Sequence, residues 1–480
     1  MAPRFSEHFG LELSQAELDF VDIELEGDLP LFVDPYALSI YPGEWYEECH
    51  ALLIHFFSLL LSRIRSGDHA RATEMLGHLS EPNDTRLGLS KGKPSGRGIG
   101  PKYATDFYDK IVASRAAQTG QLTDISDCEL MIEGVGSDRI SDMTINIIRS
   151  KLLEYTQNQC AVWGVPVQQV PSGLCWDADR EGWVNSFTRL PVYKGSTIVL
   201  VPRIAVRYRS VIDHEQYYNG FVLNYLQAEH LSANTSLVKV LKNEKRVVYK
   251  KDLKVVFPLK KDNISEFAEK KPKTLEKYKA HAKAHDRAIT PEGIESRHSA
   301  PKEIRYDDMG AKLRSIPSGR EHADEFHNVI VGALETIFSP DLMNPKKEER
   351  IHDGRKRIDI VFDNSCVIGF FHSLHVLHRI HCPFIFVECK NYQSDMGNPE
   401  FDQLTGRFSK RRGQFGLLVC RDKGEAKACA ARCKDVMNDD RGVVLVLDDN
   451  DIINLLDMRA RLTRDQINDH MSKLLRDVMM

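Results

Sequence analysis

Hydrophobic and polar positions follow a regular order in the last third of the chain. Apolar residues at helical spacing predict helices over 321–338, 399–408, 425–437 and 451–458. Short apolar runs rich in β-branched residues predict strands over 357–362, 384–389, 415–420 and 443–447. Strands that alternate with helices across short loops are typical of an α/β fold.

Residues 1–260 have a mixed pattern without such regularity. Apolar spacing predicts helices over 48–64 and 141–159, and an apolar run predicts a strand over 198–206 that contains Pro202. The Gly-, Ser- and Lys-rich segment 89–102 is predicted to be a loop. We recognise no family for this region and expect a larger N-terminal α+β region of unknown fold, which senses a trigger, binds substrate or assembles oligomers.

A charged segment separates these two regions. Residues 263–287 carry many Lys and Glu and few large apolar residues, and proline and glycine punctuate the chain up to about 320. The sequence therefore predicts three parts: residues 1–260, a charged helical connector over 261–320, and a C-terminal domain over 321–480. The connector is either a solvated charged face or a basic arm that follows DNA.

Composition narrows the class of protein. The 480 residues are 42% hydrophobic and 28% charged, which is ordinary for a globular protein. Lys and Arg number 65 against 69 Asp and Glu, so any contact with nucleic acid must use a local patch. The longest apolar run, 51–61, is too short to span a bilayer. The ten cysteines show no CxxC spacing, and no signal peptide is evident, so we expect a cytoplasmic protein without a membrane partner.

Charged residues interrupt two of the predicted strands. Asp359 lies between Ile358 and Ile360, and Glu388 and Lys390 share one face of the strand while Cys389 points the other way. Charges at the end of an apolar strand are costly unless they find partners. Two carboxylates from two strands can bind one hard cation such as Mg²⁺, with the carbonyl of Cys389 as a further ligand. Lys390 can then hold the attacking water or shield the phosphoryl oxyanion.

These residues resemble a known superfamily. The segment Gly354-Arg355-Lys356-Arg357-Ile358-Asp359 is followed by Val387-Glu388-Cys389-Lys390-Asn391, with 28 residues between Asp359 and Glu388. Together the two segments are similar to the motif of the PD-(D/E)XK nucleases. The resemblance covers about residues 321–460 and implies a restriction-endonuclease-like mixed sheet flanked by helices. It also implies a nuclease that uses Mg²⁺ or Mn²⁺, with DNA as the expected substrate, in a restriction-like antiphage-defence effector that forms a dimer or higher homo-oligomer.

The same resemblance points to further site residues. Members often add a carboxylate from the first helix, for which Glu325 is best placed and Glu335 is the second choice. Members also often carry a Gln on the helix after the second strand, which fits Gln403, with Arg407 one turn further to contact a phosphate. Each of these is alternatively an ordinary polar position of a surface helix. A basic groove for nucleic acid would consist of Lys390, Arg407, Lys410, Arg411 and Arg412.

Weaker signals leave alternatives open. Histidines recur every third residue from His372 to His381, which favours a helix beside the sheet over a zinc site. The loop over 89–102 lacks a complete P-loop motif and is a surface loop or a phosphate contact. Asp138 and Asp142 indicate a helix start, capped by Ser137 or Ser141, or else an acidic ligand pair. A nucleic-acid-binding protein with a nuclease-like module, a repair or mobile-element nuclease, and an RNase stay open as functions.

Overall fold

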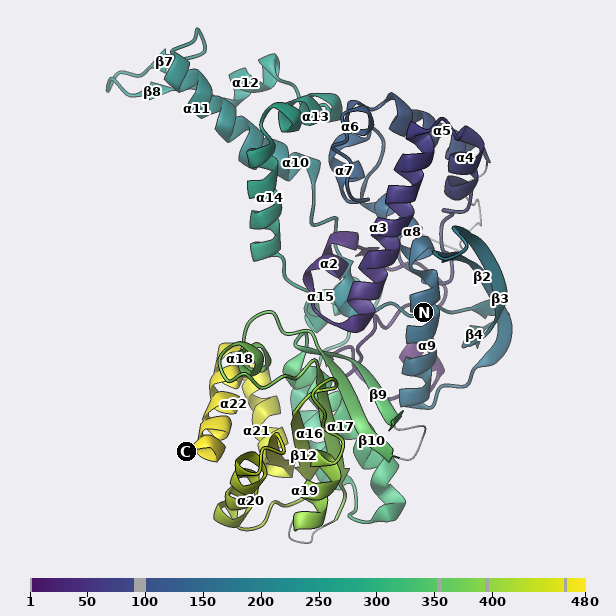
Figure 1. Cartoon of the computed structure of the whole chain (residues 1–480), viewed down its shortest axis with the longest axis vertical. Coiled ribbons are helices and arrows are strands. Elements are labelled where there is room, and N and C mark those ends of the chain that lie inside the picture. Colours follow the sequence, from purple (N-terminus) through teal and green to yellow (C-terminus); the bar gives the residue numbers. More distant parts are fainter. Residues whose placement is uncertain (1, 90–100, 352–355, 393–396, 462–463) are drawn as a thin grey trace.

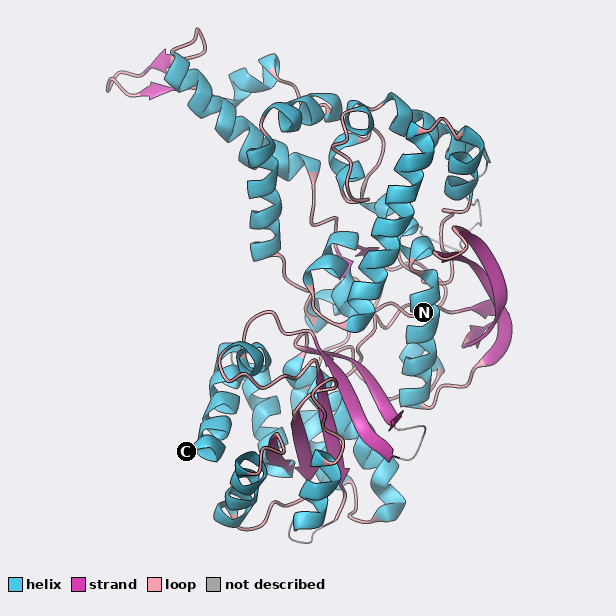
Figure 2. Cartoon of the chain, viewed as in Figure 1, coloured by secondary structure: helices cyan, strands magenta, loops and turns pink. Residues whose placement is uncertain are grey.

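The chain folds into two parts that follow one another along its longest axis. The computed structural model describes residues 2–89, 101–351, 356–392, 397–461 and 464–480. Figure 1 shows a mainly helical N-terminal part above a C-terminal part built on a sheet, and Figure 2 shows the same division by element type. Among the described residues, no helix combines the length and the apolar character that crossing a bilayer requires. All ten cysteines are described, buried and outside any disulfide.

Long amphipathic helices form the centre of the N-terminal part. Helix α3 (Glu44–Arg65) contains the predicted helix over 48–64 and buries an aromatic and aliphatic face that includes Trp45 and Phe56. The other helices are α1 (Phe5–His8), α2 (Pro35–Ile40), α4 (His69–Gly77), α5 (Pro101–Ala113), α6 (Arg115–Gln118), α7 (Asp127–Met131), α8 (Ser137–Ile147) and α9 (Arg149–Trp163).

The single helix predicted over 141–159 is wrong, because the structure has two helices that meet at Ile148. Asn146 donates from Nδ2 to the carbonyl oxygens of Asp142 and Ser80, at 2.7 and 2.5 Å. A side chain that bonds the main chain four residues earlier competes with helical bonding, and the break follows directly after it. Helix α8 begins where Asp138 indicated, but the expected caps differ: Gly136 is the N-cap, while the hydroxyls of Ser137 and Ser141 accept from Ser210 and Val33.

The N-terminal strands are short, apart from one outer hairpin. Strands β2 (Gln168–Asp177) and β3 (Gly182–Leu190) form this antiparallel hairpin. The strand predicted over 198–206 is wrong except at its end, because the N–H groups of Ile198, Val199 and Leu200 donate to loop carbonyls and to the Thr156 hydroxyl instead of a neighbouring strand. The short elements are β1 (Phe32–Val33), β4 (Val192–Tyr193), β5 (Ser196–Thr197), η1 (Arg203–Ala205) and β6 (Val206–Arg207).

A helical segment leads from this part to the C-terminal part. It includes a projecting arm and then helices that pack against the two parts of the molecule. Helix α13 packs on α6 and α7 of the N-terminal part, and α16 packs on α17 and α21 of the C-terminal part. The predicted connector is therefore helical, but it continues as packed helices where irregular chain was expected, since Met309 and Leu313 of α16 are buried. The elements are α10 (His214–Tyr217), η2 (Tyr218–Val222), α11 (Leu223–Ala233), β7 (Lys239–Val240), β8 (Arg246–Val247), α12 (Lys250–Val256), α13 (Lys261–Lys270), α14 (Pro272–His285), α15 (Pro291–Glu295) and α16 (Tyr306–Ser315).

The C-terminal part is a five-stranded mixed sheet flanked by helices, so the predicted α/β class is confirmed for this region. The strand order is β13-β12-β11-β10-β9, with β9, β10 and β11 antiparallel and β11, β12 and β13 parallel. The edge strand β9 was not predicted. The strands are β9 (Leu342–Ile351), β10 (Lys356–Asn364), β11 (Phe384–Lys390), β12 (Phe415–Cys420) and β13 (Val443–Asp448).

Helices cover this sheet much as the sequence predicts. Helices α17 and α21 pack against each other and the sheet, while α19 packs on β11 and β12, and α20 on β13. The helices are α17 (Ala323–Phe338), preceded by η3 (Arg320–His322), α18 (Phe370–Val376), α19 (Asn398–Thr405), α20 (Ala426–Asn438), α21 (Asp449–Arg461) and α22 (Arg464–Met479). The last of these was not predicted.

The two parts share one continuous hydrophobic core. A buried ion pair crosses between them, since Arg203 Nη2 lies 3.0 Å from Glu335 Oε2 on α17. Asp19 also accepts from the hydroxyl of Tyr155 at 2.6 Å and from the main-chain N–H of Asn344 on β9 at 3.2 Å. These contacts hold the N-terminal part in a fixed position against α17 and β9.

Candidate active site at the ends of strands β10 and β11

The antiparallel pairing of β10 with β11 brings the two predicted carboxylates together. The paired positions run from Asp363 opposite Phe384 to Ile360 opposite Val387. Asp359 and Glu388 are the next residues on their strands, directly beyond this last pair. The N–H of Cys389 donates to Asp359 Oδ2 at 3.0 Å, so a side chain replaces the main-chain partner where the ladder ends.

Glu388 lies at the centre of a hydrogen-bonded group. Its side chain is fully buried, and its Oε1 accepts from Lys390 Nζ at 2.8 Å and from Gln403 Nε2. Lys390 Nζ also donates to Gln403 Oε1 at 2.9 Å, which closes a triangle of three side chains. Two of them come from β11 and the third from α19, so the structure brings three of the predicted site residues together, with Glu388 and Lys390 on one strand face as predicted.

Burial and like charge determine the electrostatics of this group. Burial, followed by the neighbouring Asp359 carboxylate, raises the pKa of Glu388 to about 7, and the Lys390 ammonium counteracts only part of that rise. Glu388 Oε2 is buried and has no hydrogen-bond partner among the described residues. An unpaired buried carboxylate oxygen beside a second carboxylate is costly, and a cation would remove both penalties.

The donor set suits a hard divalent cation. Asp359 and Glu388 offer carboxylate oxygens, which are the ligands that Mg²⁺ and Mn²⁺ prefer. Because the protein supplies only a small number of ligands, coordination positions stay open for water and phosphate. The main chain of Cys389 lies against Asp359 through its N–H, while its buried thiol has a pKa that burial raises far above the usual range. A role for the Cys389 carbonyl as a ligand stays a prediction.

The structure adds two residues that sequence reasoning missed. His327 on α17 has its Nε2 3.9 Å from Asp359 Oδ2, and burial lowers the pKa of this imidazole. Lys347 on β9 donates to Asn328 on α17 at 2.7 Å, and burial lowers its pKa too, although the nearby carboxylates of Asp324 and Glu348 oppose this. No spacing in the sequence pointed to either residue, since both depend on how α17 and β9 lie beside β10.

The first-helix carboxylates lie differently from what the resemblance implies. The Glu325 side chain is about half exposed and its carboxylate lies 3.4 Å from His322 Nδ1. Asp324, which the sequence did not single out, acts on both His327 and Lys347, as does Glu348 on β9. Glu335 is fully buried against Arg203 at the contact between the two parts. The structure therefore brings neither Glu325 nor Glu335 into contact with Asp359 or Glu388.

Of the predicted basic residues after α19, Arg407 lies beside the site. Arg407 donates from Nε to the carbonyl of Arg357 on β10 at 2.8 Å, and its charge lowers the pKa of Glu388 slightly. Arg412 donates from Nη2 to the carbonyl of Arg407 at 3.2 Å. Lys410 and Arg411 are exposed in the turn between α19 and β12. Gly354 and Arg355 of the sequence motif lie outside the described residues.

Where the structure describes them, the other predicted signals do not form a second centre of this kind. Helix α18 contains His372 and His375 but ends at Val376, so the histidine repeat continues beyond the helix. Burial and nearby acids raise the pKa of Asp142 to about 8, and the charge of Arg139 offsets part of this rise. Most of the glycine-rich segment, residues 90–100, lies outside the described part of the chain.

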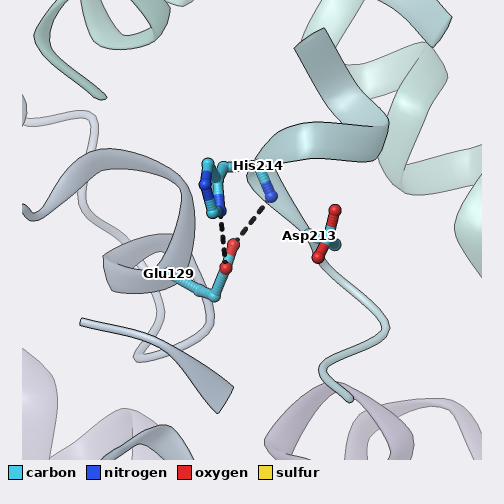
Figure 3. A group of neighbouring side chains, drawn as sticks. All are labelled: Glu129, Asp213 and His214. Carbon is cyan, nitrogen blue, oxygen red and sulfur yellow. Dashed lines mark hydrogen bonds and ion pairs between the residues drawn. The ribbon is translucent and has the colours of Figure 1, made fainter. Parts of the chain in front are cut away.

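One cluster in the N-terminal part has the composition of a metal site. Glu129, Asp213 and His214 bring one ligand atom each within 4.8 Å of one another. Figure 3 shows these three side chains and the bonds between Glu129 and His214. Glu129 accepts from both the main-chain N–H and Nδ1 of His214, each at 2.8 Å, and Asp213 accepts from the N–H of Gln216 at 2.7 Å to cap α10. These bonds account for the cluster as the start of α10 held against α7.

Comparisons with known proteins concern the N-terminal part. No curated protein and no solved structure matches the chain. Residues 10–213 are similar to a family described as a domain of unknown function, DUF8370, and this match ends well before the strands that carry Asp359 and Glu388.

Proposed function

We propose that the protein is a metal-dependent nuclease that hydrolyses phosphodiester bonds, with DNA as the expected substrate. The observation that carries the proposal is the Glu388–Lys390–Gln403 triangle beside Asp359, with one buried Glu388 oxygen left without a partner. A five-stranded mixed sheet flanked by helices is compatible with the PD-(D/E)XK resemblance, which supports the same activity.

Each side chain has a defined part in this proposal. Asp359 and Glu388 would hold a divalent cation, which supplies positive charge to stabilise the phosphoryl oxygens and to promote ionisation of the attacking water. Lys390, held by Glu388 and Gln403, places an ammonium next to the cation site, where it stabilises charge that develops on the phosphate. Gln403 fixes the position of both partners and leaves the Lys390 ammonium with a donor free for substrate or water.

The surroundings favour a polyanionic substrate. Arg407, just after α19, donates to the carbonyl of Arg357 on β10 and acts electrostatically on Glu388, and Lys410, Arg411 and Arg412 follow it before β12. Positive charge next to a site that binds a cation allows the backbone of a nucleic acid to approach despite the net acidity of the chain. A restriction-like defence role, a homo-oligomer and a cytoplasmic location stay part of the proposal, since they depend on the resemblance and the composition.

The test is cleavage of supercoiled plasmid, linear duplex DNA and RNA with Mg²⁺ or with EDTA. We expect the wild type to cut only with the cation, and E388Q or D359N to lose about 100-fold or more in rate. The matched control is D402N, because Asp402 precedes Gln403 on α19 but its side chain pairs with Arg441 at 2.5 Å. A folded E388Q protein that cuts at the wild-type rate, or a wild type that cuts none of the three substrates, would overturn the proposal.

A further inference from the structure

An arm projects from the N-terminal part at the end of the molecule opposite the C-terminal sheet. It consists of α11 (Leu223–Ala233), the hairpin of β7 and β8, and α12 (Lys250–Val256), and Figure 1 shows it extending away from the remaining elements at the upper left. We call residues 239–260 the arm tip. An element that extends into solvent loses the packing that would stabilise it, so its sequence is informative about what it contacts.

The arm tip has the opposite charge balance from the rest of the chain. It holds eight Lys and Arg against two acids, Glu244 and Asp252, although the whole chain has 65 basic and 69 acidic residues. Most of these basic side chains are exposed, and the exposed ones are Lys239, Lys242, Lys245, Arg246, Lys251, Lys254 and Lys260.

Several of these charges have no counter-charge in the protein. Within the described part of the chain, the side chains of Lys242, Lys245 and Lys254 have no hydrogen-bond or ion-pair partner. By contrast, Lys239 lies 2.7 Å from Asp252. Lys239 and Lys251 both place their ammonium groups over the Tyr249 ring, at 5.4 and 5.5 Å from its centroid, which concentrates positive charge at one point. Like charges held close together repel, and a polyanion relieves that repulsion.

The positive surface continues from the arm along α14. This helix runs from beside the arm toward the C-terminal part in Figure 1, and Lys273, Lys277 and Lys283 are exposed on it. The stretch from residue 239 to residue 287 contains 16 Lys and Arg against seven Asp and Glu. A surface of this extent matches a long, uniformly charged partner better than a small ligand.

We infer that the arm tip binds the sugar-phosphate backbone of a nucleic acid, as a second contact remote from the candidate active site. The role of this contact rests on the proposed function. An anchor far from the scissile bond would retain a long substrate without taking part in cleavage. Lysines without partners are suited to phosphates, which they contact as point charges independent of base sequence.

An anionic membrane is the competing partner, and the geometry argues against it. The exposed apolar and aromatic residues of the arm tip are spread over several elements: Val240 is on β7, Val255 and Val256 are on α12, and Tyr249 and Leu259 lie outside both. Val255 and Val256 are adjacent in sequence, so they do not form one apolar stripe along α12. The residue of α12 that does face apolar surroundings, Leu253, is already buried in the protein. The turn between β7 and β8 is mostly polar, with Lys242, Asn243, Glu244 and Lys245, so the end of the hairpin has little to insert between lipids.

The experiment measures binding separately from cleavage. Fluorescein-labelled 60-base-pair duplexes of DNA and of RNA are titrated with full-length protein in EDTA at several NaCl concentrations. The arm variant is K242Q/K245Q/K254Q. The control, K427Q/K473Q/R476Q, removes three exposed basic residues of α20 and α22. Three lost phosphate contacts lower the slope of log affinity against log salt by about 2.7, and lower affinity at 0.1 M NaCl by about tenfold or more.

Each outcome decides the inference. A selective loss in the arm variant, with the control unchanged, supports it, and the two duplexes show whether DNA or RNA is bound. Unchanged affinity and an unchanged salt slope in the arm variant would overturn it. It would also be overturned if the wild type binds phosphatidylserine vesicles and the arm variant loses that binding but still binds the duplexes. Cleavage assays with Mg²⁺ distinguish this inference from the proposed function. If the wild type cuts and the arm variant still binds the duplex normally, the inference about the arm fails while the proposed nuclease activity stands.

Discussion

Substitution of Arg203 by Met tests whether the buried ion pair between the two parts holds the molecule together. The guanidinium donates from Nη1 to the carbonyls of Gln15 and Ala16 at 3.3 Å each, and from Nη2 to Glu335 Oε2 at 3.0 Å. The Arg203 and Glu335 side chains are 3% and 0% exposed. Methionine fills much of the same volume but supplies no donor, so the carbonyls and the Glu335 carboxyl lose their partner in a place that water does not reach.

The expected cost is large. Removal of one partner from a buried pair typically lowers the free energy of unfolding by about 3–5 kcal/mol. Burial and the nearby Asp19 already raise the pKa of Glu335 far above its usual range, so protonation of this carboxyl limits the cost to the lower end of that interval. The double variant R203M/E335M removes both charges, and we expect it to recover part of the loss.

The assay is urea denaturation followed by two signals. All four tryptophans lie between residues 45 and 183, so their fluorescence reports on the N-terminal part, whereas far-ultraviolet circular dichroism reports on the whole chain. We expect coincident transitions in the wild type and an earlier fluorescence transition in R203M. A loss below about 1 kcal/mol with coincident transitions would refute the reasoning, because the pair would then contribute little to the contact.

Two further predictions concern the C-terminal sheet. K390M should lower the cleavage rate by about 100-fold while calorimetry still detects Mg²⁺, and loss of both would contradict the assigned role. Burial raises the pKa of Asp363 to about 6, so this carboxyl stabilises the fold when protonated, and that contribution disappears as the pH rises through about 6. Relative to D363N, the wild type should therefore lose about 3 kcal/mol of unfolding free energy between about pH 4 and pH 7 in urea titrations, and a constant difference would contradict this.

The sequence predicts the buried strands of the sheet well because their composition leaves little choice. The run at β12 is continuously apolar, β13 is apolar up to Asp448, and β11 is apolar up to Glu388, as is typical of strands covered on both faces. The edge strand β9 was missed because Lys346, Lys347, Glu348, Glu349 and Arg350 make it look like a solvent-exposed loop. Charged residues are common on edge strands, where they prevent pairing with other chains.

The candidate site also has a part that the sequence predicts and a part that it does not. Glu388 and Lys390 share one strand face, and that relation follows from the period of two along a strand. The contact of His327 with Asp359 depends on how α17 lies against β10, which no local spacing encodes. The arm tip was missed for another reason: charge was considered over 263–287, while the segment before it looked like ordinary mixed chain.

Helix α17 connects the contact between the two parts to the candidate site. Glu335 near its end is buried against Arg203, and His327 lies beside Asp359. These residues are eight positions apart, or about 12 Å along the helix. A rigid helix cannot shift at one of these points without moving the other, so a change in the N-terminal part that displaces Glu335 would move His327 against Asp359. The N-terminal part is therefore well placed to control the proposed cleavage, and a fragment without it would expose the apolar surface that now forms the shared core. Point variants in the full chain are the sound way to study that control, because they leave this surface covered.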